Sequence, residues 1–441
     1  MSYAILASIP LFFALIALEW LIARKRGREV YQLDDTLTNL HLGAGQLLTG
    51  LLVKLPLVAL YALTFEHTEG VRATLGVQWW PQEAFSASWG VWLVGVLLMD
   101  LAYYAFHRVS HEVNALWAAH AVHHQSEEYN LSVALRQSWL QQVYSGLFYL
   151  PLALLGVPLP AFLLLNATNT VAQFWIHTRL IDRLGPLEWV LNTPSHHRVH
   201  HGADEEYLDK NYAGLLIIWD RLFGTFEPEV RAPCYGVVKP LRSWNSGWAN
   251  LAVWSQLLAR ARAVAHTGER STLSAFLSLA LKAPAGQLPE EAQLSISQLS
   301  VSQLSVSQGL LTTDEGYQRY RPTSRAPAYV LTQGALSLAT GLWVIACEPS
   351  SSLGAVSLWV GAHLMAGVTL GALSEGRSWA LKGELARLVS LPLLAFLSPL
   401  SLSLELSAQV ERLMTPPQLT FWLALSVCSG LWLIMTHKGD A

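Results

Sequence analysis

Charged residues are scarce in this chain of 441 residues, since Lys, Arg, Asp and Glu together make up only 13% of it. The formal net charge is −3, and no basic run interleaved with aromatic residues occurs, so nothing indicates nucleic-acid binding. Hydrophobic residues make up 52% of the chain, and 18 residues are tryptophan. This composition argues against an ordinary soluble protein and predicts a chain that crosses a membrane several times.

Cysteine is also rare. The three cysteines, Cys234, Cys347 and Cys428, form no CxxC pair, so we expect neither a zinc ribbon nor a disulfide framework, and we place the polar regions on the intracellular side. Three metal-binding signatures are missing as well: the HExxH helix of zinc proteases, the HxE…PCxxC pattern of zinc deaminases and the ExxH motifs of four-helix di-iron proteins. Any metal site must therefore use other ligands.

Histidine, in contrast, is grouped in an unusual way. Eight of the 15 histidines fall in three short boxes, and two more, His177 and His196, precede the last box. The boxes are His107-Arg-Val-Ser-His111, His120-Ala-Val-His123-His124 and His197-Arg-Val-His200-His201. Spacings of three and four residues place imidazoles on one face of a helix, and neutral imidazole is the commonest metal ligand among side chains. Protonated imidazolium rings in such numbers would repel one another unless a metal ion replaced their protons. The boxes therefore predict a metal centre.

Eight or nine imidazoles are too many for one ion, since zinc, for example, takes four ligands. We therefore expect two metals, although imidazole alone does not distinguish zinc, copper, iron and nickel. A histidine-rich site with two metals, beside helices that can hold an alkyl chain, suits oxygen chemistry on a lipid carbon. Isolated histidines in apolar helices are usually structural, and we expect this of His41, His67, His363 and His437.

Apolar runs predict an all-α membrane bundle, with the metal site in a helical lobe on the cytosolic side. The runs cover residues 4–23, 40–65, 88–106, 328–346, 353–374, 386–407 and 418–436. Residues 138–173, interrupted by Pro151, Gly156 and Pro160, predict a hairpin of short or partly re-entrant segments. Because Arg24 to Arg28 follow the first run, the positive-inside rule places the three boxes on the cytoplasmic face.

Four regions follow from this pattern. Residues 1–87 hold N-terminal spans, 88–265 the catalytic region, 266–325 a linker and 326–441 the C-terminal spans. The linker contains three copies of a unit Leu-Ser-Ile/Val-Ser-Gln between Gln293 and Gln308. A period of five matches neither helix nor strand, so we expect this tract to be flexible.

Four carboxylates are candidates for orienting the imidazoles, namely Asp100, Glu112, Glu127 and Asp220. Asp100 shares a helix face with His107, or else it is a carboxylate at a helix end near the lipid headgroups. Asp220 holds an imidazole N–H, or else it pairs with Arg221 or another cation.

The boxes, in this order and separated by a hairpin, resemble the fatty acid hydroxylase/sterol desaturase superfamily of membrane di-iron enzymes. Within it, residues 111–138, 173–178, 192–202 and 209–226 are similar to the alkylglycerol monooxygenase group. The resemblance covers roughly residues 30–230.

The resemblance implies two iron ions and molecular oxygen, which hydroxylate the alkyl carbon next to an ether oxygen and give an aldehyde and a glycerol lipid. It implies that the eight box histidines are ligands, with His177 as a ninth and His196 as a ligand or a residue behind one. Gln173 stands where other members have a further histidine, which leaves one metal a ligand short or bound to water. The electron donor is a pterin, as tetrahydrobiopterin is in the animal enzyme, or a redox protein.

Two other functions stay open. The same site fits a sterol or fatty acyl hydroxylase or desaturase, which only the products distinguish. A metal transporter is less consistent with the boxes, because its ligands should lie within the spans. We expect a multi-pass protein of an endoplasmic reticulum-type or bacterial inner membrane, with a membrane lipid as substrate.

Overall fold

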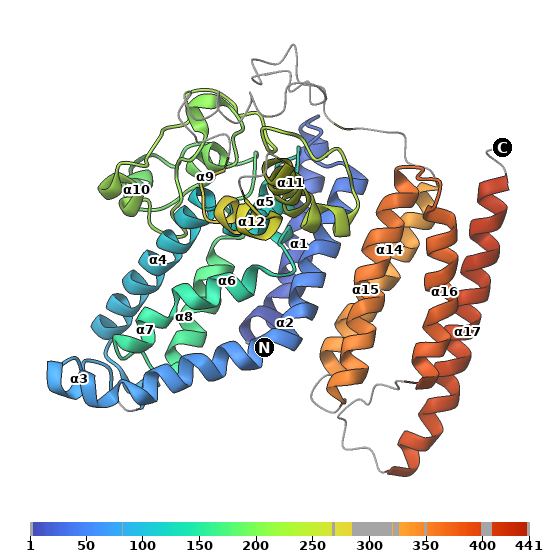
Figure 1. Cartoon of the computed structure of the whole chain (residues 1–441), viewed down its shortest axis with the longest axis horizontal. Coiled ribbons are helices and arrows are strands. Elements are labelled where there is room, and N and C mark those ends of the chain that lie inside the picture. Colours follow the sequence, from blue (N-terminus) through green and yellow to red (C-terminus); the bar gives the residue numbers. More distant parts are fainter. Residues whose placement is uncertain are drawn as a thin grey trace.

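The computed structural model describes residues 3–81, 83–266, 270–284, 320, 326–347, 351–397 and 408–438. Within these residues the regular structure is helical, apart from two isolated β-bridges, Leu191 with Leu216 and Gly202 with Tyr235 (Figure 1). The predicted all-α class is therefore confirmed.

The long N-terminal helices carry a lobe of shorter helices and loops at one end (Figure 1). The long helices are α1 (Tyr3–Lys25), α2 (Leu33–His67) and α4 (Trp89–Glu112), with the short α3 (Glu69–Leu75) after α2. The lobe contains α5 (Asn114–His124), α9 (Pro194–His200), α10 (Ile218–Phe223), α11 (Ser246–His266) and α12 (Thr272–Ala280). The end of α4 leads directly into α5, so the first two histidine boxes enter the lobe together.

The predicted hairpin consists of three helices, α6 (Gln141–Phe148), α7 (Leu150–Leu154) and α8 (Leu159–Ala172). The chain reverses between α7 and α8, where Gly156 has a φ of +88°, a conformation that favours glycine. These helices pack against α4 and α2, and α8 leads back to the lobe (Figure 1). The hairpin thus returns the chain to the end of the molecule that holds the second histidine box.

Among the residues that the structure describes, four helices are long and apolar enough to cross a membrane: α2, α4, α14 (Pro327–Cys347) and α15 (Leu353–Ser374). They include four of the predicted spans and make this a multi-pass membrane protein. The first predicted span falls in α1. The run predicted at 386–407 falls partly in α16 (Ala380–Leu397) and partly outside the described residues, and the last run lies in α17 (Ala408–Lys438).

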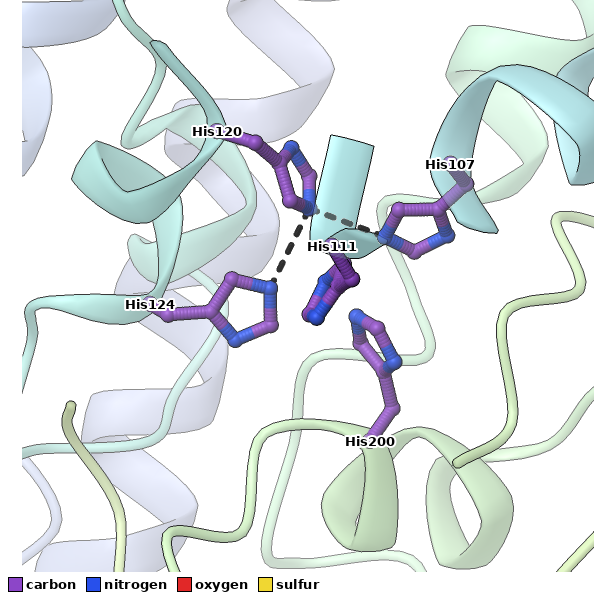
Figure 2. A group of neighbouring side chains, drawn as sticks. All are labelled: His107, His111, His120, His124 and His200. Atoms are coloured by element: carbon purple, nitrogen blue, oxygen red, sulfur yellow. Dashed lines mark hydrogen bonds between the residues drawn. The ribbon is translucent and has the colours of Figure 1, made fainter. Parts of the chain in front are cut away.

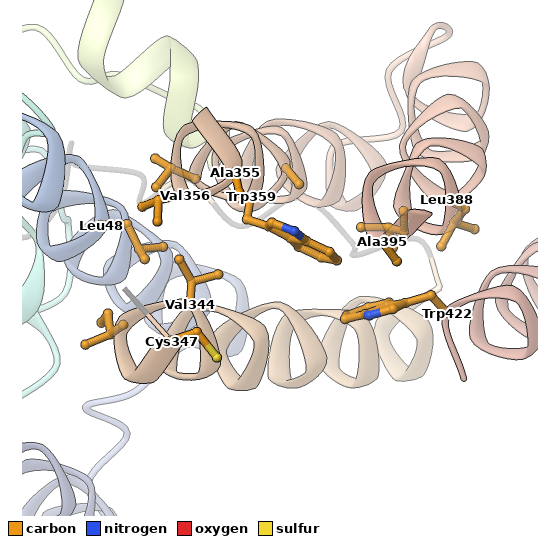
Figure 3. Close-up of a cluster of buried hydrophobic side chains, with 13 residues drawn as sticks. Leu48, Val344, Cys347, Ala355, Val356, Trp359, Leu388, Ala395 and Trp422 are labelled. Atoms are coloured by element: carbon orange, nitrogen blue, oxygen red, sulfur yellow. The ribbon is translucent and has the colours of Figure 1, made fainter. Parts of the chain in front are cut away.

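Helices α14 and α15 pack against α2, and an aromatic core lies among the C-terminal helices. Trp359 is fully buried, and its ring centroid lies 5.4 Å from that of Trp343 and 5.1 Å from that of Trp422. Figure 3 shows Leu48 of α2 in the same cluster. Residues that belong to both halves of the chain therefore share one hydrophobic core.

Helical structure continues past the boundary that we predicted at residue 266. Helix α12 packs on α11, and the carbonyl of Lys282 accepts the backbone N–H of Asn114 at the start of α5. Burial of Ala275 and Ala280 explains why this segment is ordered. The Leu-Ser-Gln tract lies outside the described residues.

Candidate metal centre

Three helices and one loop supply the histidines of the centre. His107 and His111 are one turn apart at the end of α4, and the second box occupies the end of α5. His197 and His200 lie on α9, His201 caps that helix, and His177 follows α8. All nine are buried, with exposed fractions of 5% or less, so the lobe removes their rings from bulk water.

The nine histidines form two groups, each with all its candidate ligand atoms within 4.8 Å of one another. The first group has five members and the second has four. The first consists of His107, His111, His120, His124 and His200, and the second of His123, His177, His197 and His201. In Figure 2 the rings of the first group point toward a common centre, with Nε2 of His120 2.9 Å from Nε2 of His107 and 3.2 Å from Nε2 of His124.

The two groups adjoin each other. His124 of the first group and His201 of the second have ring centroids 4.4 Å apart, and those of His200 and His201 are 5.4 Å apart. The adjacent residues of the second and third boxes belong to different groups, because neighbours on a helix point about 100° apart. The arrangement therefore provides two neighbouring sites rather than one large cluster.

The Nδ1 atoms of five rings are held by acceptors of the protein. Four of these acceptors are backbone carbonyls: Tyr212 for His107, Arg136 for His123, Gln173 for His177 and Lys210 for His200, at 2.7 to 2.9 Å. The fifth is the Asp209 carboxylate, 3.3 Å from Nδ1 of His111. Because a carbonyl only accepts, these Nδ1 atoms carry the proton and the Nε2 lone pairs are free to bind a metal.

Some ring nitrogens of the two groups have no hydrogen-bond partner among the described residues. Nε2 of His111, His200 and His201 is sealed from solvent and makes no hydrogen bond among the described residues. An unpaired buried nitrogen costs free energy, and a metal ion at each group would remove that cost. The donor set therefore fits two ions that accept imidazole, such as iron or zinc.

Electrostatics agree with neutral rings. Burial, followed by the repulsion of neighbouring imidazoles, holds the pKa values of His120, His124 and His201 well below the ordinary value. Burial likewise lowers the pKa of His123 to about 4. Neutral imidazole is the form that binds a metal, so no proton has to leave at neutral pH.

Asp220 acts on the centre through the backbone. Its carboxylate accepts the N–H of Tyr212 and of Ala213, each at 2.8 Å, and the Thr225 hydroxyl at 2.7 Å. Burial raises the pKa of Asp220, and these hydrogen bonds oppose that shift. Because the Tyr212 carbonyl accepts Nδ1–H of His107, Asp220 positions a ligand indirectly. Within the described residues it therefore binds neither an imidazole N–H nor Arg221 or another cation, the roles that we considered.

Asp100 also binds the loop that follows the last box. It accepts the N–H groups of Leu215 and Leu216 and the indole N–H of Trp219, at 2.8 to 3.0 Å, and the amide of Asn169. It is fully buried and makes no hydrogen bond to a histidine among the described residues. Seven residues along a helix span about 10 Å, so sharing a face with His107 does not bring Asp100 into contact with it.

The remaining candidates lie away from both groups. Glu112 is exposed and pairs with Arg108, while Glu127 accepts the backbone N–H of Tyr320 at 2.6 Å. His196 belongs to neither group, since its Nε2 lies 4.0 Å from the Glu188 carboxylate and its ring packs on Phe226.

Sequence reasoning did not identify the acceptors behind the ligands. Backbone carbonyls leave no signature in a sequence, and the roles of Tyr212, Lys210 and Arg136 depend on the path of the chain. For Asp209, the sequence offered one signal, the polar segment Asp209-Lys-Asn-Tyr. In the structure, Asp209 and Asn211 of this segment have φ values of +59° and +53°. Such left-handed residues form a tight turn, which directs Asp209 and two carbonyls toward the histidines.

Comparison with known proteins agrees with this geometry. Residues 92–225 match the fatty acid hydroxylase family. Alkylglycerol monooxygenase of Xenopus tropicalis is 40% identical over 252 residues, and that of Homo sapiens is 43% identical over 243 residues. These alignments cover 54% of this chain, with 54% of the frog protein and 51% of the human protein, so the chain spans about half the length of the curated relatives it matches.

A bacterial relative is named for a different activity. Ornithine lipid hydroxylase OlsE of Rhizobium tropici is 34% identical over 135 residues, which cover 30% of this chain and 41% of that protein. No solved structure matches the chain. The family match contains every histidine of both groups, so the resemblance noted in the sequence is confirmed where the site lies. The match to the fatty acid hydroxylase family therefore spans the whole candidate metal centre.

Proposed function

We propose that this protein is an oxygen-dependent lipid monooxygenase with one iron ion in each histidine group, and that it hydroxylates the alkyl carbon next to the ether oxygen of an alkylglycerol. The observation that carries the proposal is the pair of adjacent, buried, all-histidine groups at the end of apolar helices. The alkylglycerol monooxygenases that match across the site support the ether lipid as substrate.

Iron ions bound there would supply the activation of molecular oxygen, which an unactivated carbon–hydrogen bond requires. The protein's own contribution is positional. Five of the nine imidazoles are oriented by carbonyls and by Asp209, and the burial of all nine excludes water that would compete with a lipid carbon. We propose that the second group, with four histidines, keeps the more open site.

The site also needs a route for lipid and for electrons. Helices α4 and α8 lead from the apolar region to His107 and His177, so we propose that the alkyl chain enters between them from the bilayer. We place the centre on the cytoplasmic face, as the basic residues after α1 suggest. The electron donor is a pterin or a redox protein in this proposal.

The test is conversion of a labelled alkylglycerol by membranes that contain the protein, with products identified by mass spectrometry and metals measured on the same preparation. We expect labelled aldehyde, or the acid derived from it, with about two irons per chain. His123→Ala should abolish the product, because it removes a member of the second group.

The family match favours a second candidate, hydroxylation of a fatty acyl chain. Bound iron without ether cleavage, together with a hydroxylated or desaturated acyl or sterol product, would establish that alternative. Zinc in place of iron would contradict both oxygenase proposals.

A further inference from the structure

Two polar side chains lie one helical turn below the metal centre, on the side of the apolar helices. Tyr103 precedes His107 by four residues on α4, and their ring centroids are 5.3 Å apart. Gln173 precedes His177 by four residues at the end of α8, and its carbonyl accepts Nδ1–H of His177 at 2.9 Å. One of these residues therefore stands under each histidine group.

Gly214 places the two side chains beside each other. A Cβ atom at this glycine would lie 2.7 Å from Cδ1 of Tyr103 and 2.9 Å from Oδ1 of Asp100, closer than side chains approach, and 3.1 Å from Nε2 of Gln173, which is a tight contact. Both side chains thus press on the same point of the loop that follows the last box. That loop is fixed by Asp100, which accepts two of its backbone N–H groups.

Each side chain has one polar atom left over. Gln173 uses its amide N–H group on Asn169, and neither its Oε1 nor the Tyr103 hydroxyl has a hydrogen-bond partner in the part of the chain that the structure describes. Neither atom is sealed from solvent, although protein surrounds Tyr103 closely. Both side chains are partly buried, and each therefore offers an unpaired polar atom beside the loop at Gly214.

We infer that Tyr103 and Gln173 bind the oxygen atoms of the lipid and so select its reacting carbon. The Tyr103 hydroxyl donates a hydrogen bond to the ether oxygen, which can only accept. Oε1 of Gln173 accepts one from the free hydroxyl on the neighbouring glycerol carbon. This donor and acceptor make no hydrogen bond within the described protein, so a ligand with a matching acceptor and donor can pair with both.

The inference rests on the proposed function and explains its regiochemistry. A lipid held by its ether oxygen one turn below His107 presents the first carbon of its alkyl chain to the centre. A lipid without that oxygen leaves the Tyr103 hydroxyl unpaired, and a site built to form a hydrogen bond discriminates against such analogues.

The experiment compares two substrates within each variant: an alkylglycerol and its analogue with a methylene group in place of the ether oxygen. For the unaltered protein we expect a clear preference for the ether, measured as the ratio of kcat/KM values. Tyr103→Phe should reduce that ratio about three- to tenfold, as the loss of one hydrogen bond predicts, with unchanged iron content. Gln173→Met should instead reduce the preference for a free neighbouring hydroxyl over its deoxy analogue.

Tyr61→Phe is the matched control, because the Tyr61 hydroxyl is already paired with the carbonyl of Val157 within an apolar cluster. It should leave both ratios unchanged. A variant that folds poorly lowers both substrates alike, so the ratio separates recognition from structural damage. Unchanged ratios in both Tyr103→Phe and Gln173→Met would overturn the inference. Failure of the unaltered protein to convert any alkylglycerol, with iron bound, would overturn the proposed function itself.

Discussion

Replacement of Asp220 tests whether the centre is organised from behind its ligands. The carboxylate is fully buried and accepts three hydrogen bonds, from Tyr212, Ala213 and Thr225. An asparagine has one acceptor oxygen, and its amide N–H₂ would face at least one of these donors. Since hydrogen bonds to a charged group contribute about 1.5–3 kcal/mol each, Asp220→Asn should lower the free energy of unfolding by about 2–4 kcal/mol, and Asp220→Ala by more.

The same change should weaken metal binding. The Tyr212 carbonyl accepts Nδ1–H of His107 at 2.7 Å, and the Asp220 carboxylate accepts the backbone N–H of Tyr212. Loss of a group that orients a ligand typically costs about 10- to 100-fold in metal affinity. We expect Asp220→Asn to lose iron to a chelator at concentrations that leave the unaltered protein loaded, as measured by elemental analysis.

Asp182→Asn is the control, because Asp182 is exposed and its replacement should change stability by less than about 0.5 kcal/mol. Thermal unfolding and chelator titration of the three proteins, purified in one detergent, provide the comparison. If Asp220→Asn unfolds and loses metal as the unaltered protein does, the carboxylate does not organise the Tyr212 turn. The reasoning from burial and hydrogen bonds would then be refuted.

Three further predictions concern the ligands and their surroundings. His177→Ala leaves three histidines in its group and should reduce the metal content from about two ions per chain to about one. His111→Ala leaves four histidines in the other group and should retain more metal. Elemental analysis that found less metal in His111→Ala than in His177→Ala would contradict the grouping. Gly214→Ala would force contacts under 3 Å and should cost about 1–3 kcal/mol in thermal unfolding, whereas Gly70→Ala, in an open helical position, should be neutral or stabilising. Arg198→Met should cost about 3 kcal/mol because it leaves a largely buried carboxylate without its cation, and denaturant titration that showed no loss would argue against that pair.

How much could be predicted from the sequence depends on the range of each interaction. The spacing within a histidine box is local, so it identified eight of the nine members of the two groups, and the resemblance to the family supplied the ninth, His177. The assignment to groups depends on how boxes far apart meet, and His123 and His124 diverge although they are neighbours. Asp100 was expected near His107 because of a shared helix face, but it binds a loop more than 100 residues later. Such long-range partners leave no periodic signal.

The division of the ligands between distant segments also affects how the protein is made. Each group contains at least one histidine from residues 197–201, so neither site is complete until that segment has left the ribosome. By then the hairpin of α6 to α8 must already have turned back, because otherwise His177 and the last box would emerge on the opposite side of the bilayer from the first two. Only correctly inserted chains can therefore acquire a full complement of metal, and the metal content of a membrane preparation reports on the fraction of chains with the right topology.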